Sequence, residues 1–166
     1  MEYVSTNNAP GAIGPYSQAV KTGNLLFTSG QIAINPATGN VEATTIEAQT
    51  RQVCENLKAV VEAAGTSLDK AVKTVCFLAD IADFAKFNEV YGTYFTAKPA
   101  RSCVAVKDLP KGVLCSKTFV SMLKKKANRA VWPKMRQTKK RKLPKLSLKK
   151  ARKSLPRNLL LTLTAT

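Results

Sequence analysis

The chain has 166 residues, which is enough for one domain of ordinary size with a buried core. Its formal net charge of +17 is unevenly distributed, because residues 1–115 balance ten acids with ten Lys or Arg, whereas residues 116–166 hold the other seventeen Lys or Arg and no acid. These counts exclude a protein that is basic throughout and predict a neutral globular domain followed by a polycationic segment.

The cysteines and the terminus exclude several classes of protein. None of the four cysteines has a CxxC spacing and the chain has no His, so no zinc site is indicated. Cys54 and Cys76 lie in apolar stretches and are expected to be small buried hydrophobes. No stretch reaches the ~18 apolar residues of a membrane span, and no secretory signal is visible. Free cysteines fit a reducing compartment, so we expect the cytoplasm, with the mitochondrion or nucleus as alternatives, and no membrane partner.

The first third of the chain is predicted to form strands. Residues 2–5 can make a short strand, which the Asn-Ala-Pro-Gly run at residues 8–11 ends. Residues 17–21 alternate in polarity, and residues 25–32 form an apolar, β-prone run. Because Thr-Gly-Asn at residues 22–24 is a turn sequence, the two runs are expected to form a hairpin.

The middle of the chain predicts a helix over residues 46–64. Either Thr44 or Thr45 is a suitable N-cap, and Gly65 is a suitable residue just past the end. The apolar residues recur at helical spacing and indicate one buried stripe: Val53, Leu57, Val60, Val61 and Ala64.

The next part predicts a strand, a second helix and two more strands. Residues 71–79 read as a buried strand, and Asp83 can cap a helix from residue 84 to about residue 95. Residues 100–106 alternate like a half-buried strand, and Val113 starts a final strand. The second helix has its own apolar stripe: Phe84, Phe87, Val90, Tyr91 and Phe95. The order β-β-β-α-β-α-β-β predicts an α+β fold with two helices on one face of a mixed sheet.

Several segments, in a fixed order and spacing, resemble one known family. They are NAPGAIGPYSQAV at residues 8–20, GNLLFTSGQI at 23–32, EAQTRQ at 47–52 with Asn56-Leu57, VKTVC at 72–76, Asp83-Phe84 with Asn88, and PARSCV at 99–104. Together they resemble the Rid family of reactive-intermediate (enamine/imine) deaminases, also called the liver perchloric-acid-soluble ribonuclease family. The resemblance covers about residues 3–115.

The resemblance implies a fold and a reaction. The implied fold is the chorismate-mutase-like (bacillus-type) sheet, assembled as a homotrimer whose sheets form a central barrel with sites between subunits. The implied reaction is hydrolysis of 2-iminobutanoate, 2-iminopropanoate or their enamine tautomers to 2-ketoacids and ammonia, without metal or organic cofactor. Some family members are described as ribonucleases or translation inhibitors, so an RNA- or ribosome-associated binding protein is the alternative function.

The same resemblance implies the site residues. Arg101 suits the substrate carboxylate, because a guanidinium can bind it with two parallel hydrogen bonds. Cys103 leaves the same strand face and is expected to pack at the pocket wall, since no His is present to activate it as a nucleophile. The further substrate-binding candidates are Tyr16, Ser29, Gly30 and Asn88. Their alternatives are a core aromatic for Tyr16, a plain strand end for Ser29 and Gly30, and a solvated helix residue for Asn88.

One expected catalytic group is missing from the sequence. Imine hydrolysis needs a positioned water and a group that accepts its proton and later helps ammonia to leave. By resemblance a Glu on the last strand does this, but its position falls here at Ser116 or Lys117, and no carboxylate follows. General acid–base assistance is typically worth ~10²–10⁴-fold, so we expect the ligand to bind and turnover to be slow.

The last part of the sequence is predicted to be a separate basic segment. We place the deaminase-like domain at residues 1–123 and the segment at residues 124–166, where low apolar content predicts disorder unless a polyanion binds. Three origins stay open: a native arm that binds RNA or another polyanion, a frame-shifted end, or an engineered extension. The clearest cationic clusters are Lys124, Lys125, Lys126, Lys139, Lys140, Arg141 and Lys142.

Overall fold

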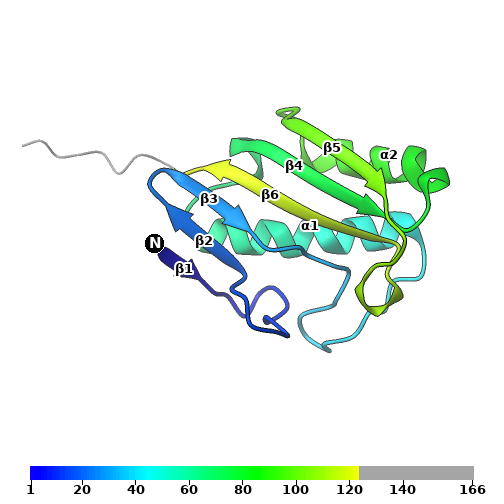
Figure 1. Ribbon diagram of the computed structural model, residues 1–166, viewed down its shortest axis with the longest axis horizontal. Helices are drawn as coiled ribbons and strands as arrows, with labels where there is room; N and C mark the ends of the chain where they lie inside the picture. The colour runs from blue at the N-terminus through cyan, green and yellow to red at the C-terminus, as the bar shows by residue number, and fades with distance from the viewer. Residues whose placement is uncertain (124–166) are drawn as a thin grey trace, which may run out of the picture. The chain divides into compact units, whose positions relative to one another are not determined.

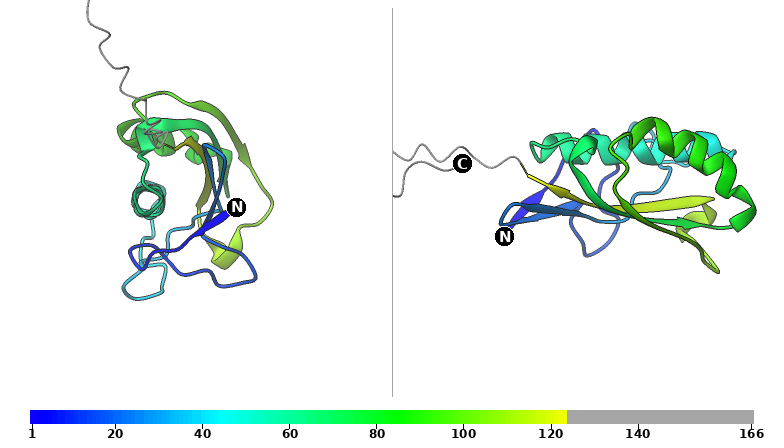
Figure 2. Two further views of the ribbon diagram at one scale, coloured as in Figure 1. Left: turned by 90° about the vertical axis from the view of Figure 1, so that its left-hand side faces the viewer. Right: turned by 90° about the horizontal axis from the view of Figure 1, so that it is seen from above.

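The computed structural model describes residues 1–123, which form a mixed six-stranded sheet with two helices. Figure 1 shows the sheet and Figure 2 shows both helices on one of its faces, while the other face stays uncovered. The predicted α+β class and element order are confirmed. The strands are β1 Glu2–Val4, β2 Ala19–Thr22, β3 Leu25–Thr28, β4 Ala71–Leu78, β5 Ala100–Ala105 and β6 Cys115–Met122.

The last strand of the sequence lies in the middle of the sheet. The spatial order is β1-β2-β3-β6-β4-β5, and β6 is antiparallel to both β3 and β4. Among the strands of residues 1–123, only β4 and β5 are parallel, because helix α2 carries the chain back between them. The N-terminal hairpin and the β4–β5 pair therefore meet only through β6 (Figure 1).

Helix α1 spans Ile46–Ala63, close to the predicted range. Of the two candidate caps the structure selects Thr45, whose side-chain oxygen accepts a hydrogen bond from the Ala48 amide at 3.3 Å. Gly65 follows the helix with a φ of 81°, a conformation that glycine adopts without steric cost. The predicted stripe, from Val53 to Val61, is buried.

Helix α2 spans Phe84–Tyr94, and its apolar stripe is buried at Phe87, Val90 and Tyr91. Asp83 occupies the N-cap position, but its side chain makes no capping hydrogen bond, so the predicted cap interaction is wrong. A short 3-10 turn at Ile81–Asp83 precedes the helix, and the carboxylate of Asp80 accepts from the Ala82 amide there. The capping group therefore lies one turn earlier than the sequence pattern indicated.

Strand β3 is shorter than predicted, since it ends at Thr28 and not at residue 32. Ser29 no longer pairs with β6, although its amide still donates to the Gln18 carbonyl, next to β2, at 3.0 Å. Pairing resumes only at Gln31, which exchanges two backbone hydrogen bonds with Lys117 at 2.9 and 3.1 Å. The interruption opens the sheet around Gly30.

A lysine lies in the centre of the hydrophobic core. Lys117 is 0% exposed, and its Nζ donates to Cys54 Sγ at 3.2 Å. The same nitrogen lies 4.4 Å from the ring centroid of Tyr91 and 4.5 Å from that of Phe95. Within residues 1–123 no carboxylate lies within 4 Å of it. Removing a cation from water without a counter-charge is costly, so the aromatic rings and the sulfur offset only part of that cost.

The inward side of β6 carries a second poorly matched polar group. Ser121 is 0% exposed, and its hydroxyl has no hydrogen-bond partner within the described part of the chain. The backbone of β6 nevertheless pairs with β4 from Cys115 to Ser121 and with β3 from Val120 to Met122. The ladder therefore holds the strand in place although two of its inward side chains, Lys117 and Ser121, do not suit the core.

The sequence predicted no membrane partner for this chain, and it predicted that the basic segment binds RNA or another polyanion. Among residues 1–123, no helix has the length and apolar character needed to cross a membrane. The segment at residues 124–166, with its clusters at 124–126 and 139–142, lies outside the described residues. Its binding of RNA stays a prediction of the sequence.

Lys117→Met is expected to stabilise the domain, because methionine fills a similar volume among the aromatic rings and carries no charge to desolvate. We expect the free energy of unfolding to rise by about 1–3 kcal/mol, measured by urea denaturation. The control is Lys58→Met, on the exposed face of α1, which should change it by less than about 0.5 kcal/mol. A loss of stability in Lys117→Met would show that the cation is a net stabiliser.

Candidate functional site

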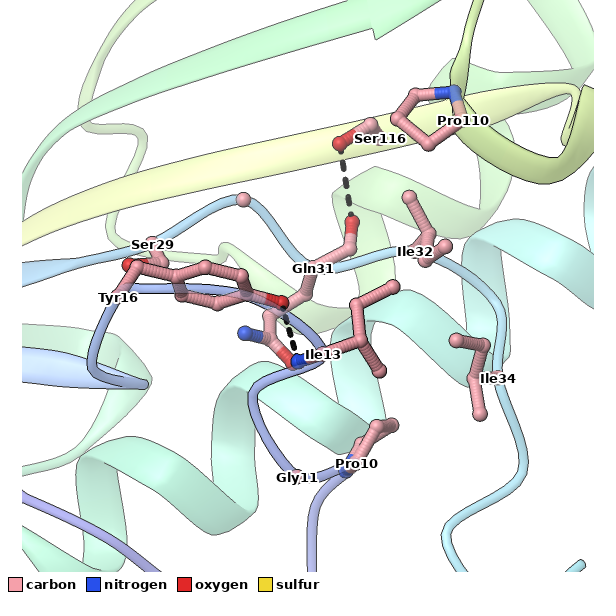
Figure 3. A pocket seen from close by; sticks show the side chains of 11 residues that line it. Pro10, Gly11, Ile13, Tyr16, Ser29, Gln31, Ile32, Ile34, Pro110 and Ser116 are labelled. Atoms are coloured by element: carbon pink, nitrogen blue, oxygen red, sulfur yellow. Dashed lines mark hydrogen bonds between the residues drawn. The ribbon is translucent and has the colours of Figure 1, made fainter. Parts of the chain in front are cut away.

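A hollow opens where β3 stops pairing with β6 (Figure 3). Its volume is about 310 Å³, and we call it the Tyr16 hollow. Three segments meet there: the N-terminal loop, the irregular stretch after β3, and the start of β6 with the turn before it. Its lining residues are Pro10, Gly11, Ile13, Tyr16, Ser29, Gly30, Gln31, Ile32, Ile34, Pro110 and Ser116.

The N-terminal loop is held against the fold by one buried amide. Gln18 is 4% exposed, and its Nε2 donates to the carbonyl oxygens of Thr6, Ala9 and Pro10 at 3.0, 3.3 and 2.9 Å. Its Oε1 accepts the Thr6 amide at 2.6 Å. Because these bonds fix the loop at one wall of the Tyr16 hollow, Gln18 shapes the site. The sequence prediction missed this role, since nothing in the pattern around Gln18 shows that its side chain turns back to the loop.

Tyr16 is positioned by a tight turn. Its amide donates to the Gly14 carbonyl at 2.8 Å, and its hydroxyl accepts the Ile13 amide at 3.3 Å (Figure 3). A Cβ at Gly14 would lie 3.4 Å from the Tyr16 ring, which is tight, so glycine lets the ring fold over the turn. Tyr16 is 46% exposed and therefore is not a core aromatic.

Gly30 and Ser116 face each other across the opened sheet. A Cβ at Gly30 would lie 3.5 Å from Ser116 Oγ, so glycine leaves this part of the hollow free. Ser116 Oγ donates to the Gln31 carbonyl at 3.2 Å (Figure 3), and Ser29 Oγ donates to the Ser17 carbonyl at 2.6 Å. The Tyr16 hollow thus has hydroxyls, amides and apolar walls, and its described lining includes no carboxylate.

The structure also separates the two positions at which the missing acid was expected. Neighbouring residues on a strand point to opposite faces, so Ser116 lines the Tyr16 hollow while Lys117 points into the core. Ser116 is therefore the residue that stands where a proton-accepting side chain could reach a ligand in this hollow.

Arg101 lies at a different hollow of about 320 Å³, which we call the Arg101 hollow. Its Nη1 donates to Asn88 Oδ1 at 2.6 Å, and its guanidinium carbon lies 4.7 Å from the ring centroid of Tyr91 and 5.5 Å from that of Phe84. Within residues 1–123 it makes no ion pair with a carboxylate. The lining residues of the Arg101 hollow are Tyr91, Gly92, Phe95, Thr96, Lys98, Pro99 and Arg101.

Cys103 lies on β5 beside Arg101 and pairs in register with Cys76 of β4. Burial raises the pKa of the Cys103 thiol, while the nearby Arg101 charge opposes that shift in part. The raised pKa keeps the sulfur protonated at neutral pH, and a thiol is a much weaker nucleophile than a thiolate. Cys103 is not among the residues that line either hollow, so its expected place at the pocket wall stays a prediction.

The predicted site residues thus form two groups within one chain. Tyr16, Ser29 and Gly30 line one hollow, together with Ser116. Arg101 lines the other hollow and donates a hydrogen bond to Asn88, which is not itself a lining residue. No hollow described within the single chain contains both Tyr16 and Arg101.

Comparison with known proteins places the domain among close relatives. Residues 6–115 match the family described as Endoribonuclease L-PSP. A RutC family protein of Pyrococcus horikoshii is 56% identical over 114 residues, covering 68% of this chain and 90% of the relative. The 2-iminobutanoate/2-iminopropanoate deaminase of Escherichia coli K12 is 52% identical over 114 residues, covering 66% of this chain and 88% of the relative.

Solved structures agree with these sequence matches. Escherichia coli TdcF, crystallised with bound serine, superposes with a TM-score of 0.72 at 41% identity, covering 75% of this chain and all of TdcF. The YjgF gene product of Escherichia coli gives the same TM-score at 44% identity and the same coverage. These matches confirm the chorismate-mutase-like sheet that the resemblance implied.

Proposed function

The chain belongs to the Endoribonuclease L-PSP (Rid) family, and from that membership we propose that it hydrolyses small 2-iminoacids to 2-ketoacids and ammonia. The observation that carries the proposal is Arg101, a guanidinium held in place by Asn88 at a hollow and without a carboxylate partner among residues 1–123. The naming of a 52% identical relative as a 2-iminobutanoate/2-iminopropanoate deaminase supports this substrate class. TdcF, which holds serine, supports a small ligand with a carboxylate.

The proposed chemistry gives Arg101 a binding role. Its guanidinium clamps the substrate carboxylate, and the hydrogen bond to Asn88 fixes its plane. Water adds to the imine carbon to give a carbinolamine, and the C–N bond then breaks as ammonia leaves. The Tyr16 hollow, which Gly30 lines, has room for a ligand of this size.

We further propose that turnover is slow because Ser116 stands at the proton-transfer position. Its hydroxyl lines the hollow but donates to the Gln31 carbonyl, and a serine hydroxyl is a very weak base at neutral pH. Lys117 cannot replace it, since its side chain is buried in the core. The lost assistance is worth about 10²–10⁴-fold.

A homotrimer would join the two groups of site residues. The uncovered face of the sheet is rich in apolar side chains, and an apolar face of this kind marks a protein–protein contact. Cross-strand pairs place Tyr3 and Phe27 on that face with Val120. Packing of this face against further copies of the chain, as in the barrel that the resemblance implies, would let Arg101 of one subunit complete the Tyr16 hollow of another.

Arg101→Ala is expected to lower kcat/KM for 2-iminobutanoate by about 10- to 100-fold, because one charged hydrogen-bonded contact to the carboxylate is lost. The imine is generated in the cuvette by an amino-acid oxidase, and its decay is followed. Arg51→Ala, on the exposed face of α1, serves as the control and should retain the rate. Absence of any wild-type rate above that in buffer, with the protein folded, would refute the deaminase proposal.

Ser116→Glu is expected to raise the rate by about 100-fold, because the new carboxylate faces the hollow and can accept the proton of the attacking water. The same imine assay measures it. Ser116→Gln, which has similar size and no basic carboxylate, should give no gain. Equal rates in the Glu and Gln variants would show that the missing acid does not limit turnover.

Val120→Glu is expected to convert the trimer to monomers, since it puts a charge in the middle of the uncovered sheet face. Sedimentation equilibrium gives the mass of the particle, and the imine assay should show a parallel loss of rate. Lys58→Glu lies on the exposed side of α1 and should leave the trimer intact. A fully active monomer would exclude a site shared between subunits.

A further inference from the structure

The Arg101 hollow contains a second cation that the proposed reaction does not use. Lys98 lines this hollow with Arg101, three residues before it in the chain. Its side chain is exposed, and within residues 1–123 it makes no ion pair with a carboxylate. Two unpaired cations at one hollow make it attractive to a ligand with more than one negative charge.

The backbone holds Lys98 at this place by an unusual conformation. Its φ is 51°, a left-handed value, and of the non-glycine residues in the described part of the chain only Lys98 and Lys111 have a positive φ. The Lys98 amide donates to the Phe95 carbonyl at 3.1 Å, which closes a tight turn after α2. A non-glycine residue in this region carries a small steric cost, and such outliers concentrate at ligand sites.

The walls of the hollow favour a ligand with an apolar middle. Tyr91 and Phe95 line the hollow and stack at 4.6 Å between ring centroids. They are 7% and 2% exposed, so they offer a ligand a small apolar edge. Arg101 is fixed by Asn88, whereas Lys98 has a long flexible stem that can adjust to the far end of a ligand. The hollow therefore offers a fixed cation at Arg101 and an adjustable one at Lys98.

We propose that Lys98 is a specificity-determining residue that selects 2-iminoacids with a second carboxylate at the end of the side chain. The proposal rests on the proposed function for the role of Arg101 as the clamp of the first carboxylate. Lys98 then binds the second carboxylate, while the methylene groups between the two carboxylates touch the small apolar edge that Tyr91 and Phe95 expose. The preferred substrates are 2-imino dicarboxylates, and the products are the matching 2-oxo dicarboxylates.

A structural role for Lys98 gives a different set of results. Since Lys98 follows the C-terminus of α2, its charge also lies near the free carbonyl groups of that helix end. In that case Lys98→Met lowers the melting temperature and leaves ligand preference unchanged. If Lys98 selects the ligand, the preference changes.

The test measures binding of 2-oxoglutarate and 2-oxobutanoate to the full chain by calorimetry at low salt. We expect the wild type to bind 2-oxoglutarate about threefold to tenfold more tightly, as one partly exposed charge pair allows. Lys98→Met should bring the ratio of the two affinities close to one, and Lys98→Arg should restore it. Lys86→Met removes an exposed charge from α2 and should keep the wild-type ratio. The seventeen cations beyond residue 115 are present in every variant, so they cannot produce the change.

Two results would overturn the proposal: a wild-type ratio near one, or a Lys98→Met ratio equal to that of the wild type. Ligand binding separates this inference from the proposed reaction, because it needs no turnover. A chain that hydrolyses no imine but loses its 2-oxoglutarate preference in Lys98→Met would refute the deaminase and retain the dicarboxylate site. A chain that hydrolyses 2-iminobutanoate and shows no preference for 2-oxoglutarate would retain the deaminase and refute the dicarboxylate site.

Discussion

The insertion of β6 between β3 and β4 is the constraint on which the rest of the domain depends. The N-terminal hairpin and the β4–β5 pair are far apart in the sequence, and within the described residues they share no other ladder. Because successive side chains of a strand point to opposite faces, β6 also assigns its residues to two environments at once. Ser116 faces the Tyr16 hollow, and Lys117 enters the core. One strand therefore decides both the connection of the sheet and the chemistry of the site.

Strand β6 places two apolar side chains, Cys115 and Phe119, in the core together with two polar ones. Hydrogen bonds to β3 and β4 satisfy the strand whatever its side chains are. The family match ends at residue 115, at the first residue of β6, and the inward residues after it include Lys117 and Ser121. The three rings of Phe87, Tyr91 and Phe95 around the Lys117 nitrogen soften the cost of its charge. This fit is poorer than an apolar strand would give.

The two hollows differ in their charged residues: one has cations that can bind an anion, and within the described residues neither has a carboxylate that can accept a proton. The described lining of the Tyr16 hollow has no carboxylate, whereas the Arg101 hollow has two cations without carboxylate partners among residues 1–123. Such a surface attracts an anionic ligand but offers little to move a proton. The uncovered apolar sheet face adds a reason for the two hollows to act together, since copies of the chain packed there would bring them close. In the proposed reaction, Arg101 recognises the ligand, whereas the residue at position 116 limits its hydrolysis.

Local patterns in the sequence were sufficient for the elements and for the resemblance. The apolar stripes of α1 and α2, the glycine after α1 and the alternation in β5 follow from short-range sterics and solvent exclusion, so they can be read without a structure. Three features could not be predicted from the sequence: the early end of β3, the cap at Asp80 and the anchoring by Gln18. Each depends on a partner that is distant in the sequence or on a turn that competes with regular pairing. The sequence left the position of the missing acid between Ser116 and Lys117. Only the tertiary structure decided it, because the register of β6 against Gln31 determines which of the two neighbours faces the hollow.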